Sequence, residues 1–152
     1  MRLHRQDMNF DNEALARAVS YAHAHEVRLY ITINNLISEE ELSPLREYLL
    51  YLDEIRPDAI LVQDFAVISL VEELGISLPL HASVMMNIHN EAAMRLLKEH
   101  GITRIVASRE MTLAEIALLR QTTGLEIEYF VHGDMCISEM IEIGRASCRE
   151  RV

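Results

Sequence analysis

Short continuous apolar runs alternate with longer stretches of helical spacing along nearly the whole chain. The run at 27–33 (VRLYITI) is rich in β-branched and aromatic residues and ends at two asparagines, which is typical of a buried strand followed by a turn. Similar runs predict four more strands, at 59–62, 78–80, 104–107 and 126–131. The sequence therefore predicts five strands separated by other structure.

Between these runs, apolar residues recur every three or four positions, as on one face of a helix. The predicted helices cover 11–23, 38–55, 65–74, 91–100 and 112–123. Asp11 is a candidate N-cap, and Ser38 and Thr112 each precede a glutamate by three positions, which is the spacing of a capping box. The last three helices are each followed by a glycine, the residue that best accepts the left-handed conformation after a helix.

Strands that alternate with helices in this way pair in parallel through right-handed crossovers. The strands are apolar throughout, which favours burial on both faces, as in a (β/α)8 barrel or a doubly wound sheet. No Gly-x-Gly-x-x-Gly or Walker-type loop follows a strand. The sequence therefore lacks the loops with which doubly wound sheets usually bind nucleotides. We therefore predict an α/β fold that forms part of a (β/α)8, TIM-barrel-like domain with five βα units. A whole barrel needs about 250 residues and eight strands.

Composition is that of an ordinary folded domain, because half of the 152 residues are hydrophobic and can form a core. The formal net charge of −10 disfavours free-standing contact with nucleic acid or anionic lipid. No apolar run approaches the roughly 20 residues of a membrane helix, and the N-terminus has no apolar signal core. We therefore expect a cytoplasmic protein without membrane contact. Two cysteines are too few for a disulfide framework.

Residues 143–152 (IGRASCRERV) differ in composition from everything before them and hold three of the 14 basic residues. The string looks like the in-frame translation of a sequencing adapter, and the alternative is a natural basic tail. We therefore expect a partial barrel domain at 1–142 and a non-native tail at 143–152. Cys148 then carries no functional argument.

Polar residues follow every predicted strand, at the positions where barrel enzymes carry their catalytic groups. They are Asn34 and Asn35 after the first strand, Gln63 and Asp64 after the second, His81, Ser83 and Asn87 after the third, Arg109 and Glu110 after the fourth, and His132 and Cys136 after the fifth. Turn and cap geometry alone explains Asn34, Asn35, Asp64 and Ser108. It does not require His81, Arg109, Glu110 or His132, for which a functional and a structural role weigh equally. Met85 and Met86 are expected to pack.

Two groupings among these residues suggest chemistry without deciding it. Ser83, His81 and Asp64 resemble a hydrolytic trio, but any three such residues at neighbouring strand ends would do so. Cys136 and His132, four positions apart, fit either a thiol–imidazole nucleophile pair or two residues of a metal site.

Three motifs, HASVMMNIHN at 81–90, SREMTLAEI at 108–116 and EYFVHGDMC at 128–136, resemble peptidase family U32, the collagenase-like peptidases. The resemblance also covers 9–34 and 62–67, and so spans nearly all of the chain before Glu139. It implies a barrel-like domain, represented here by its third to seventh strands, and proteolysis of a protein or peptide substrate.

Several members of the family instead resemble iron–sulfur proteins that support hydroxylation of transfer RNA, ribosomal RNA or a quinone precursor. The resemblance implies a four-iron four-sulfur cluster held by four cysteines, the first in a His-Gly-x-x-Cys motif that Cys136 matches. The second would fall at position 143, which is Ile143, and 139–141 already depart from the family's Tyr-Ser-Gly. One authentic cysteine cannot hold the cluster.

The family therefore implies a peptidase or a cluster-dependent hydroxylating enzyme, and a degenerate binding partner of a catalytic homologue is a third reading. Cysteines at the other three cluster positions of the parent gene would favour hydroxylation. Within this frame we expect catalytic roles for Cys136, His132 and Glu110, and substrate contacts from Gln63, Asp64, His81, Ser83, Asn87 and Arg109. We expect the parent to be an enzyme and this sequence alone to be inactive, because an incomplete barrel exposes strand edges. Assembly with itself or with a homologue stays open.

Overall fold

The computed structural model describes residues 10–132. The helices are α1 (Asn12–Ala24), α2 (Leu42–Ile55), α3 (Phe65–Glu73), α4 (Glu91–Glu99) and α5 (Leu113–Thr123), with short 3-10 turns η2 (Glu39–Glu41) and η3 (Val84–Met86). The strands are β1 (Tyr30–Ile33), β2 (Ala59–Val62), β3 (Leu80–Ala82), β4 (Ile102–Val106) and β5 (Glu126–Glu128). The predicted alternation of five strands with helices is confirmed for these residues.

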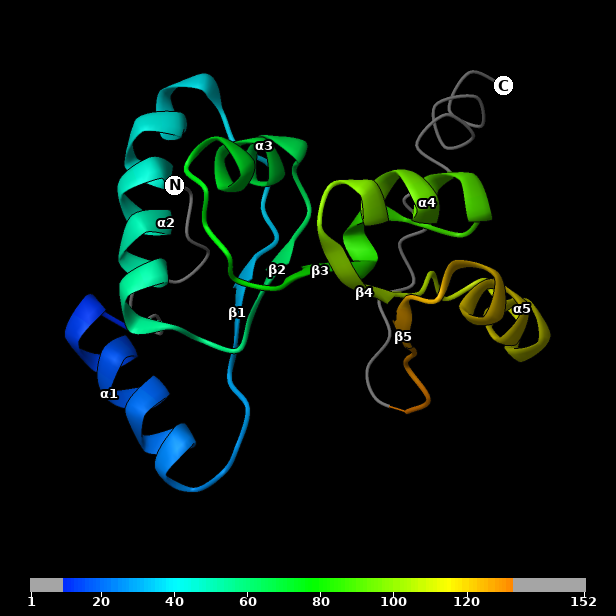
Figure 1. Cartoon of the computed structure of the whole chain (residues 1–152), viewed down its shortest axis with the longest axis horizontal. Coiled ribbons are helices and arrows are strands. Elements are labelled where there is room, and N and C mark those ends of the chain that lie inside the picture. Colours follow the sequence, from blue (N-terminus) through cyan, green and yellow to red (C-terminus); the bar gives the residue numbers. More distant parts are fainter. Residues whose placement is uncertain (1–9, 133–152) are drawn as a thin grey trace, which may run out of the picture.

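The five strands of the described part are all parallel and lie in the order β1-β2-β3-β4-β5. The order never reverses, so the sheet has no switch point of the kind that defines a doubly wound fold. Right-handed crossovers between successive neighbours place the helices on one face. In Figure 1, α2, α3, α4 and α5 follow one another around the strands from the left over the top to the right. This is the arrangement of a partial TIM-barrel-like fold.

The core lies between the sheet and these helices. In-register residues Ile33, Val62, Ala82 and Ile105 form a buried row on the helix-covered face of the sheet. Leu45, Leu49 and Leu52 of α2 belong to the same core and are 4%, 0% and 0% exposed. The strands are apolar because this face must exclude water.

Most predicted helix ends are confirmed. Asp11 caps α1 by accepting a 2.7 Å hydrogen bond from the backbone N–H of Ala14, and Thr112 and Glu115 form the capping box of α5. The predicted helix at 38–55 begins instead as a 3-10 turn and becomes α-helical only at Leu42. No helix among residues 10–132 is long and apolar enough to cross a membrane.

Two strands begin later than predicted, for reasons that the backbone shows. At the first strand, the N–H of Val27 donates to Ala22 and that of Leu29 to the Asp58 carboxylate, so the ladder begins only at Tyr30. The third strand covers Leu80–Ala82, two positions beyond the prediction, because Pro79 has no N–H to give to a neighbouring strand. The fourth covers Ile102–Val106, and the fifth ends at Glu128 rather than at 131.

Candidate active site

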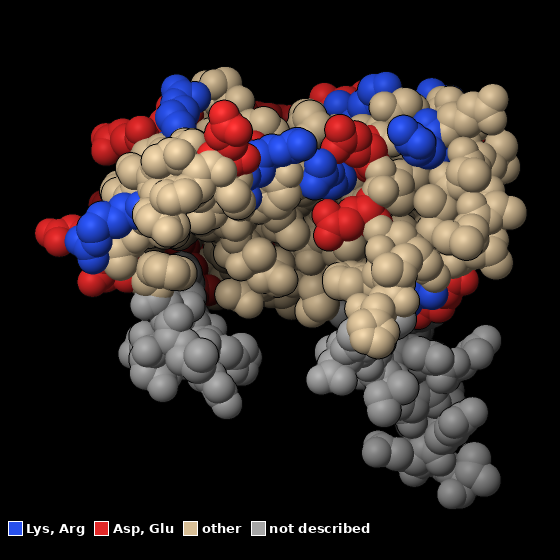
Figure 2. Space-filling model, turned by 90° about the horizontal axis from the view of Figure 1, so that it is seen from below, with Lys and Arg blue, Asp and Glu red and all other residues tan. Residues whose placement is uncertain are grey.

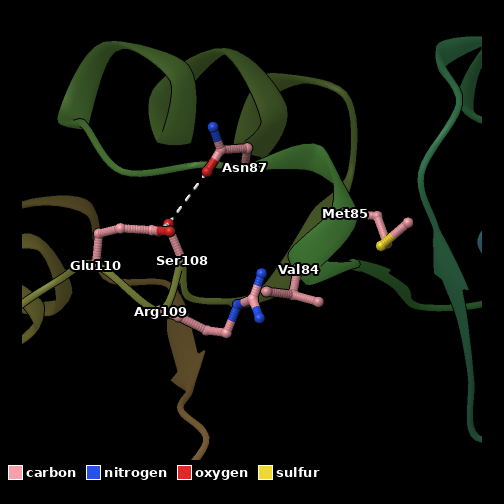
Figure 3. A pocket seen from close by; sticks show the side chains of 6 residues that line it. All are labelled: Val84, Met85, Asn87, Ser108, Arg109 and Glu110. Atoms are coloured by element: carbon pink, nitrogen blue, oxygen red, sulfur yellow. Dashed lines mark hydrogen bonds between the residues drawn. The ribbon is translucent and has the colours of Figure 1, made fainter. Parts of the chain in front are cut away.

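A shallow hollow lies where β3 and β4 end. Its walls are Val84, Met85 and Asn87 from the loop after β3, and Ser108, Arg109 and Glu110 from the loop after β4 (Figure 3). The carboxyl ends of parallel barrel strands are where TIM-barrel enzymes carry their active sites. The hollow therefore lies at the end of the sheet where the sequence predicts function.

The loop after β3 is shaped by its own polar residues. Ser83 caps η3, and its side chain accepts a 3.3 Å hydrogen bond from the N–H of Met85. Asn87 then ends the turn in the left-handed conformation, with φ 52° and ψ 46°. Asparagine tolerates this conformation better than most residues. The turn directs the Asn87 amide toward Ser108 (Figure 3).

Ser108 joins the two loops. Its side chain is buried, and Ser108 Oγ lies 3.1 Å from Asn87 Oδ1 and in hydrogen-bond contact with Glu110 Oε2. A hydroxyl has one proton to donate, and the carboxylate is the stronger acceptor. Ser108 Oγ therefore donates to Glu110 Oε2, and it accepts from the NH2 group of Asn87 when the Asn87 side-chain amide is turned so that this group faces it. Asn87, Ser108 and Glu110 thus form one hydrogen-bonded wall.

Glu110 is held in its charged form. The hydrogen bond from Ser108, and next the one from its own backbone N–H, lower the pKa of Glu110 below its ordinary value, with further attraction from Arg109 and His89. A carboxylate with a lowered pKa is a weak general base, and Ser108 is only 2% exposed. The Ser108–Glu110 pair therefore suits binding better than nucleophilic attack.

The opposite wall is apolar. Val84 and Met85 line the hollow on the β3 side, and Met85 is 39% exposed. Figure 3 shows Arg109 extending along the hollow toward Val84, away from the Asn87–Ser108–Glu110 wall. A ligand here meets hydrogen-bonding groups on one side and apolar atoms on the other.

The structure brings together three of the residues predicted for the site: Asn87, Arg109 and Glu110. Asp64 lies elsewhere, as the N-cap of α3, and its two oxygens accept from the N–H groups of Ala66 at 2.9 Å and Ile37 at 2.8 Å. Ser83 also has a capping role, and no hydrogen bond joins it to His81 or Asp64 within the described part. The hydrolytic trio is not assembled there.

The remaining predicted residues lie outside this hollow. Gln63 is half-buried directly after β2, His81 lies on β3, and His132 is exposed at the end of the described residues. Cys136 and the tail at 143–152 lie outside the described residues. The roles of Cys136, as nucleophile or as cluster ligand, stay predictions.

The iron–sulfur cluster implied by the resemblance can be tested against the donors present. Residues 10–132 contain no cysteine, and the whole sequence has only Cys136 and Cys148. Within the described ranges, no three His, Cys, Asp or Glu side chains are grouped to hold a metal ion. A cluster needs four sulfur ligands in its usual form. The donors of this chain alone do not make up a complete cluster, and a cluster in the full-length parent stays a prediction.

The sequence pattern did not predict Ser108, Val84 and Met85 as site residues. Ser108 was expected to form a turn, and Met85 was expected to pack against the rest of the protein. Ser108 does lie at a strand end, two positions before Glu110. Its contact with Asn87, 21 positions earlier, follows from the pairing of β3 with β4. A signal confined to one loop cannot show that contact.

The surface charges are mixed. In Figure 2, which views the molecule from below, blue and red side chains lie next to one another, and no continuous blue stripe crosses this face. The ion pairs Arg104–Glu126 and Arg56–Asp53 show the same local pairing of opposite charges. Steering of a polyanion by this face is therefore weak.

Comparison with known proteins gives the same family as the motifs. The sequence pattern of peptidase family U32 matches residues 1–140. The tRNA hydroxylation protein P of Helicobacter pylori (strain J99) is 32% identical over 88% of this chain and 32% of its own length. The 23S rRNA 5-hydroxycytidine C2501 synthase of Escherichia coli is 32% identical over 82% of this chain and 18% of its own. The uncharacterized protease MJ0090 of Methanocaldococcus jannaschii is 33% identical over 86% of this chain and 32% of its own length.

Among solved structures, the U32 peptidase Mk0906 superimposes with a TM-score of 0.65, at 15% identity, over 78% of this chain and 51% of that one. This likeness bears on the fold alone. The chain spans about a third or less of the length of the three relatives.

Proposed function

Because this chain belongs to peptidase family U32, we propose that it is the barrel portion of an enzyme that hydroxylates a nucleoside in RNA. One observation carries the proposal. Relatives named for tRNA hydroxylation and for 5-hydroxycytidine synthesis in 23S rRNA each match more than four-fifths of this chain. The protease among the relatives is itself named as uncharacterized. An RNA substrate in turn favours a cytoplasmic location.

The hollow supports this proposal more readily than peptide hydrolysis. A base that leaves its stack can be recognised by hydrogen bonds at its edge and by apolar contact on its faces. The hollow is shallow and offers the edge of such a base hydrogen bonds from the ionised Glu110 and from Asn87, next to the apolar side chain of Val84. Peptide hydrolysis would instead need an accessible nucleophile beside a base, and Ser108 is buried against a carboxylate of lowered pKa.

The acidity of the chain limits how RNA is bound. At a formal net charge of −10, this portion supplies little of the phosphate attraction on which RNA affinity usually rests. We therefore assign it the recognition of one nucleoside, and assign the phosphate contacts to other parts of the enzyme.

The test uses the complete product of the gene that carries this sequence, expressed in Escherichia coli that lacks both its own tRNA hydroxylation protein P and its own 23S rRNA 5-hydroxycytidine C2501 synthase. Mass spectrometry of digested tRNA and 23S rRNA measures hydroxylated nucleosides. We expect such nucleosides to appear, and Glu110→Gln to lower their amount by about tenfold, the effect of losing roughly 1.4 kcal/mol of binding or transition-state stabilisation.

Glu47→Gln on the exposed face of α2 is the matched control and is expected to leave the yield unchanged. Hydrolysis of gelatin and of a mixed peptide library is measured in parallel. Peptide hydrolysis that Glu110→Gln abolishes, without any hydroxylated nucleoside, would overturn the proposal in favour of a peptidase. Absence of both activities in a folded protein would also overturn it.

A further inference from the structure

The helix-free face of the sheet carries a row of polar side chains. Register aligns Leu61 of β2 with His81 of β3, His81 with Arg104 of β4, and Arg104 with Glu126 of β5. Aligned positions of paired strands point to the same face. The next residues along these strands pack into the core, so this row points away from the helices. Tyr30 of β1 shares the face, because it lies two positions before Thr32, the partner of Leu61.

Four of these side chains meet across the face and are named the latch residues: Tyr30, His81, Arg104 and Glu126. Arg104 is the centre, and its Nε and Nη2 donate to Glu126 Oε2 at 2.8 and 2.6 Å. Its guanidinium carbon lies 5.4 Å from the centre of the Tyr30 ring, with Nη1 3.4 Å from the Tyr30 hydroxyl. Glu128 lies 3.6 Å from Nη1 and adds a weaker attraction. One cation thus joins β1, β4 and β5.

His81 is enclosed by the same group. It is 6% exposed, and its ring meets the Tyr30 ring edge-on at 5.0 Å between centres. The Nδ1 atom is buried and has no hydrogen-bond partner. A buried polar atom without a partner is costly, so an apolar ring would pack here at lower cost. Packing alone therefore does not explain why this position is a histidine.

The charges around His81 disfavour a proton on it. Burial first, and then the positive charge of Arg104, lower the pKa of His81, while Glu126 opposes them. Glu126 is already bonded to Arg104 and is also attracted by Arg28, Tyr30 on β1 meets His81 only through its ring, and Leu61 on β2 is apolar. A proton on His81 would place two cations beside each other in a region of low dielectric.

We propose that the latch residues form a pH-sensitive closure of the helix-free face, held shut by uncharged His81. A proton on His81 repels Arg104, which withdraws from Tyr30 toward Glu126 and Glu128, both more exposed. The contact that joins β1 to β4 is then lost and His81 reaches water. Because β3 and β4 lead directly into the loops that carry Asn87 and Ser108, the opening also loosens the hollow at their ends. This inference does not depend on the proposed hydroxylation.

The test is amide hydrogen exchange of β1 and β4, measured by NMR on the complete protein at pH 7 and pH 5 and corrected for intrinsic rates. Protection in the wild type is expected to fall as the pH drops toward the midpoint of His81 titration, by up to about tenfold per pH unit, and to level off below that midpoint, since the protonated fraction rises about tenfold per unit only above the pKa. In parallel, the ring signals of His81 are expected to titrate below the ordinary histidine value of about 6.5.

His81→Phe keeps a ring of similar size and removes the titration, so its protection is expected to be equal at the two pH values. His81→Gln is the second uncharged variant, should the phenylalanine variant fail to fold. His100→Phe is the matched control, because His100 is an exposed histidine paired with Glu72, and it is expected to keep the wild-type pH dependence. An unchanged pH dependence in both His81 variants, or full protection of the wild type after His81 is protonated, would overturn the latch.

Discussion

Ser108 shows how far one residue determines the shape of the candidate site. Its hydroxyl lies against both Asn87 and Glu110, which come from loops after different strands. Without it, the two loops would keep their own turns but lose the contact that aligns their polar groups. The role is one of positioning, because Ser108 is buried beneath the groups that it holds.

Ser108→Ala is therefore expected to raise the pKa of Glu110 toward its ordinary value of 4.5, because the largest cause of its lowering is removed. A carboxyl group whose pKa is lower in the folded than in the unfolded state stabilises the fold at pH values above its unfolded pKa. This stabilisation is lost as the pH falls through the folded pKa. The variant is accordingly expected to lose less stability on acidification near pH 4. Carboxyl carbon NMR titration measures the shift. Ser77→Ala, at an exposed serine that accepts from Arg56, is the control, and an unmoved Glu110 titration would contradict the role.

Leu49 and Leu50 give a second residue-scale prediction, since adjacent leucines of α2 have opposite surroundings. Leu49 is 0% exposed and Leu50 is 46% exposed. Leu49→Ala is expected to lower the free energy of unfolding by about 3 kcal/mol, because it removes buried methyl groups and leaves a cavity. Leu50→Ala is expected to change it by less than about 0.5 kcal/mol. Urea unfolding measures both, and equal losses would show that the burial of α2 is wrongly assigned.

At the scale of elements, α5 is defined at both ends by side chains and held to its neighbour. The capping box of Thr112 and Glu115 begins the helix, and Gly124 ends it at φ 70°. Lys98 and Arg95 of α4 donate to the carbonyls of Thr123 at 2.6 Å and Thr122 at 3.1 Å. These two cations stabilise the carboxyl end of the helix and tie α4 to α5.

Gly124→Ala is expected to destabilise the protein by about 1 kcal/mol, because alanine is strained at a left-handed φ. The added Cβ would lie 3.5 Å from Lys98 Nζ, an ordinary contact, so the loss comes from the backbone and not from crowding. Gly124→Asn separates the two causes, since asparagine is larger but accepts this conformation more easily. In thermal unfolding, the midpoint temperature is expected to be highest for the wild type, lower for Gly124→Asn and lowest for Gly124→Ala. A larger loss of stability for Gly124→Asn than for Gly124→Ala would indicate crowding.

At the scale of the whole molecule, Asp58 joins the beginning of the chain to the sheet. Its Oδ2 atom accepts from the N–H of Leu29 at 2.8 Å, just before β1, and lies 3.0 Å from His23 Nε2 at the end of α1. It directly precedes β2, so one carboxylate links α1, β1 and β2. This link lies at the amino ends of the strands, opposite the hollow.

The pKa of Asp58 gives this link a definite pH dependence. Burial of the carboxylate raises its pKa, but the hydrogen bonds from Leu29 and His23 outweigh burial, and the pKa lies below its ordinary 3.8. The stabilisation is therefore complete above the unfolded pKa and is lost as pH falls through the folded one. Asp58→Asn is expected to be less stable than the wild type at pH 7 and to converge toward it near pH 2. Urea unfolding at both pH values measures the difference in free energy of unfolding between Asp58→Asn and the wild type. Glu13→Gln, at an exposed carboxylate, is the control. The same difference at pH 7 and pH 2 would contradict the prediction.

Sequence patterns predicted the elements well because their signals are local. Asp11, Thr112 and Gly124 act within a few residues of their own positions, so caps and helix ends could be read directly. Strand bounds were less accurate, because Leu29 and Val27 use their N–H groups on partners outside the sheet. Polar residues at strand ends correctly included Asn87 and Glu110, but the same pattern also selected Asp64, which the structure shows as a helix cap.

The sequence by itself determined the repeated strand–helix unit, its parallel pairing and the family, since hydrophobic period and motif spacing are properties of neighbouring residues. Tertiary structure alone decided that Ser108 meets Asn87, and that Tyr30 and Arg104 meet across the helix-free face, 74 positions apart. Such contacts depend on strand register and on sheet curvature, which brings side chains of non-adjacent strands together. A one-residue change of register would turn these side chains to the other face, and nothing in the local sequence records that choice.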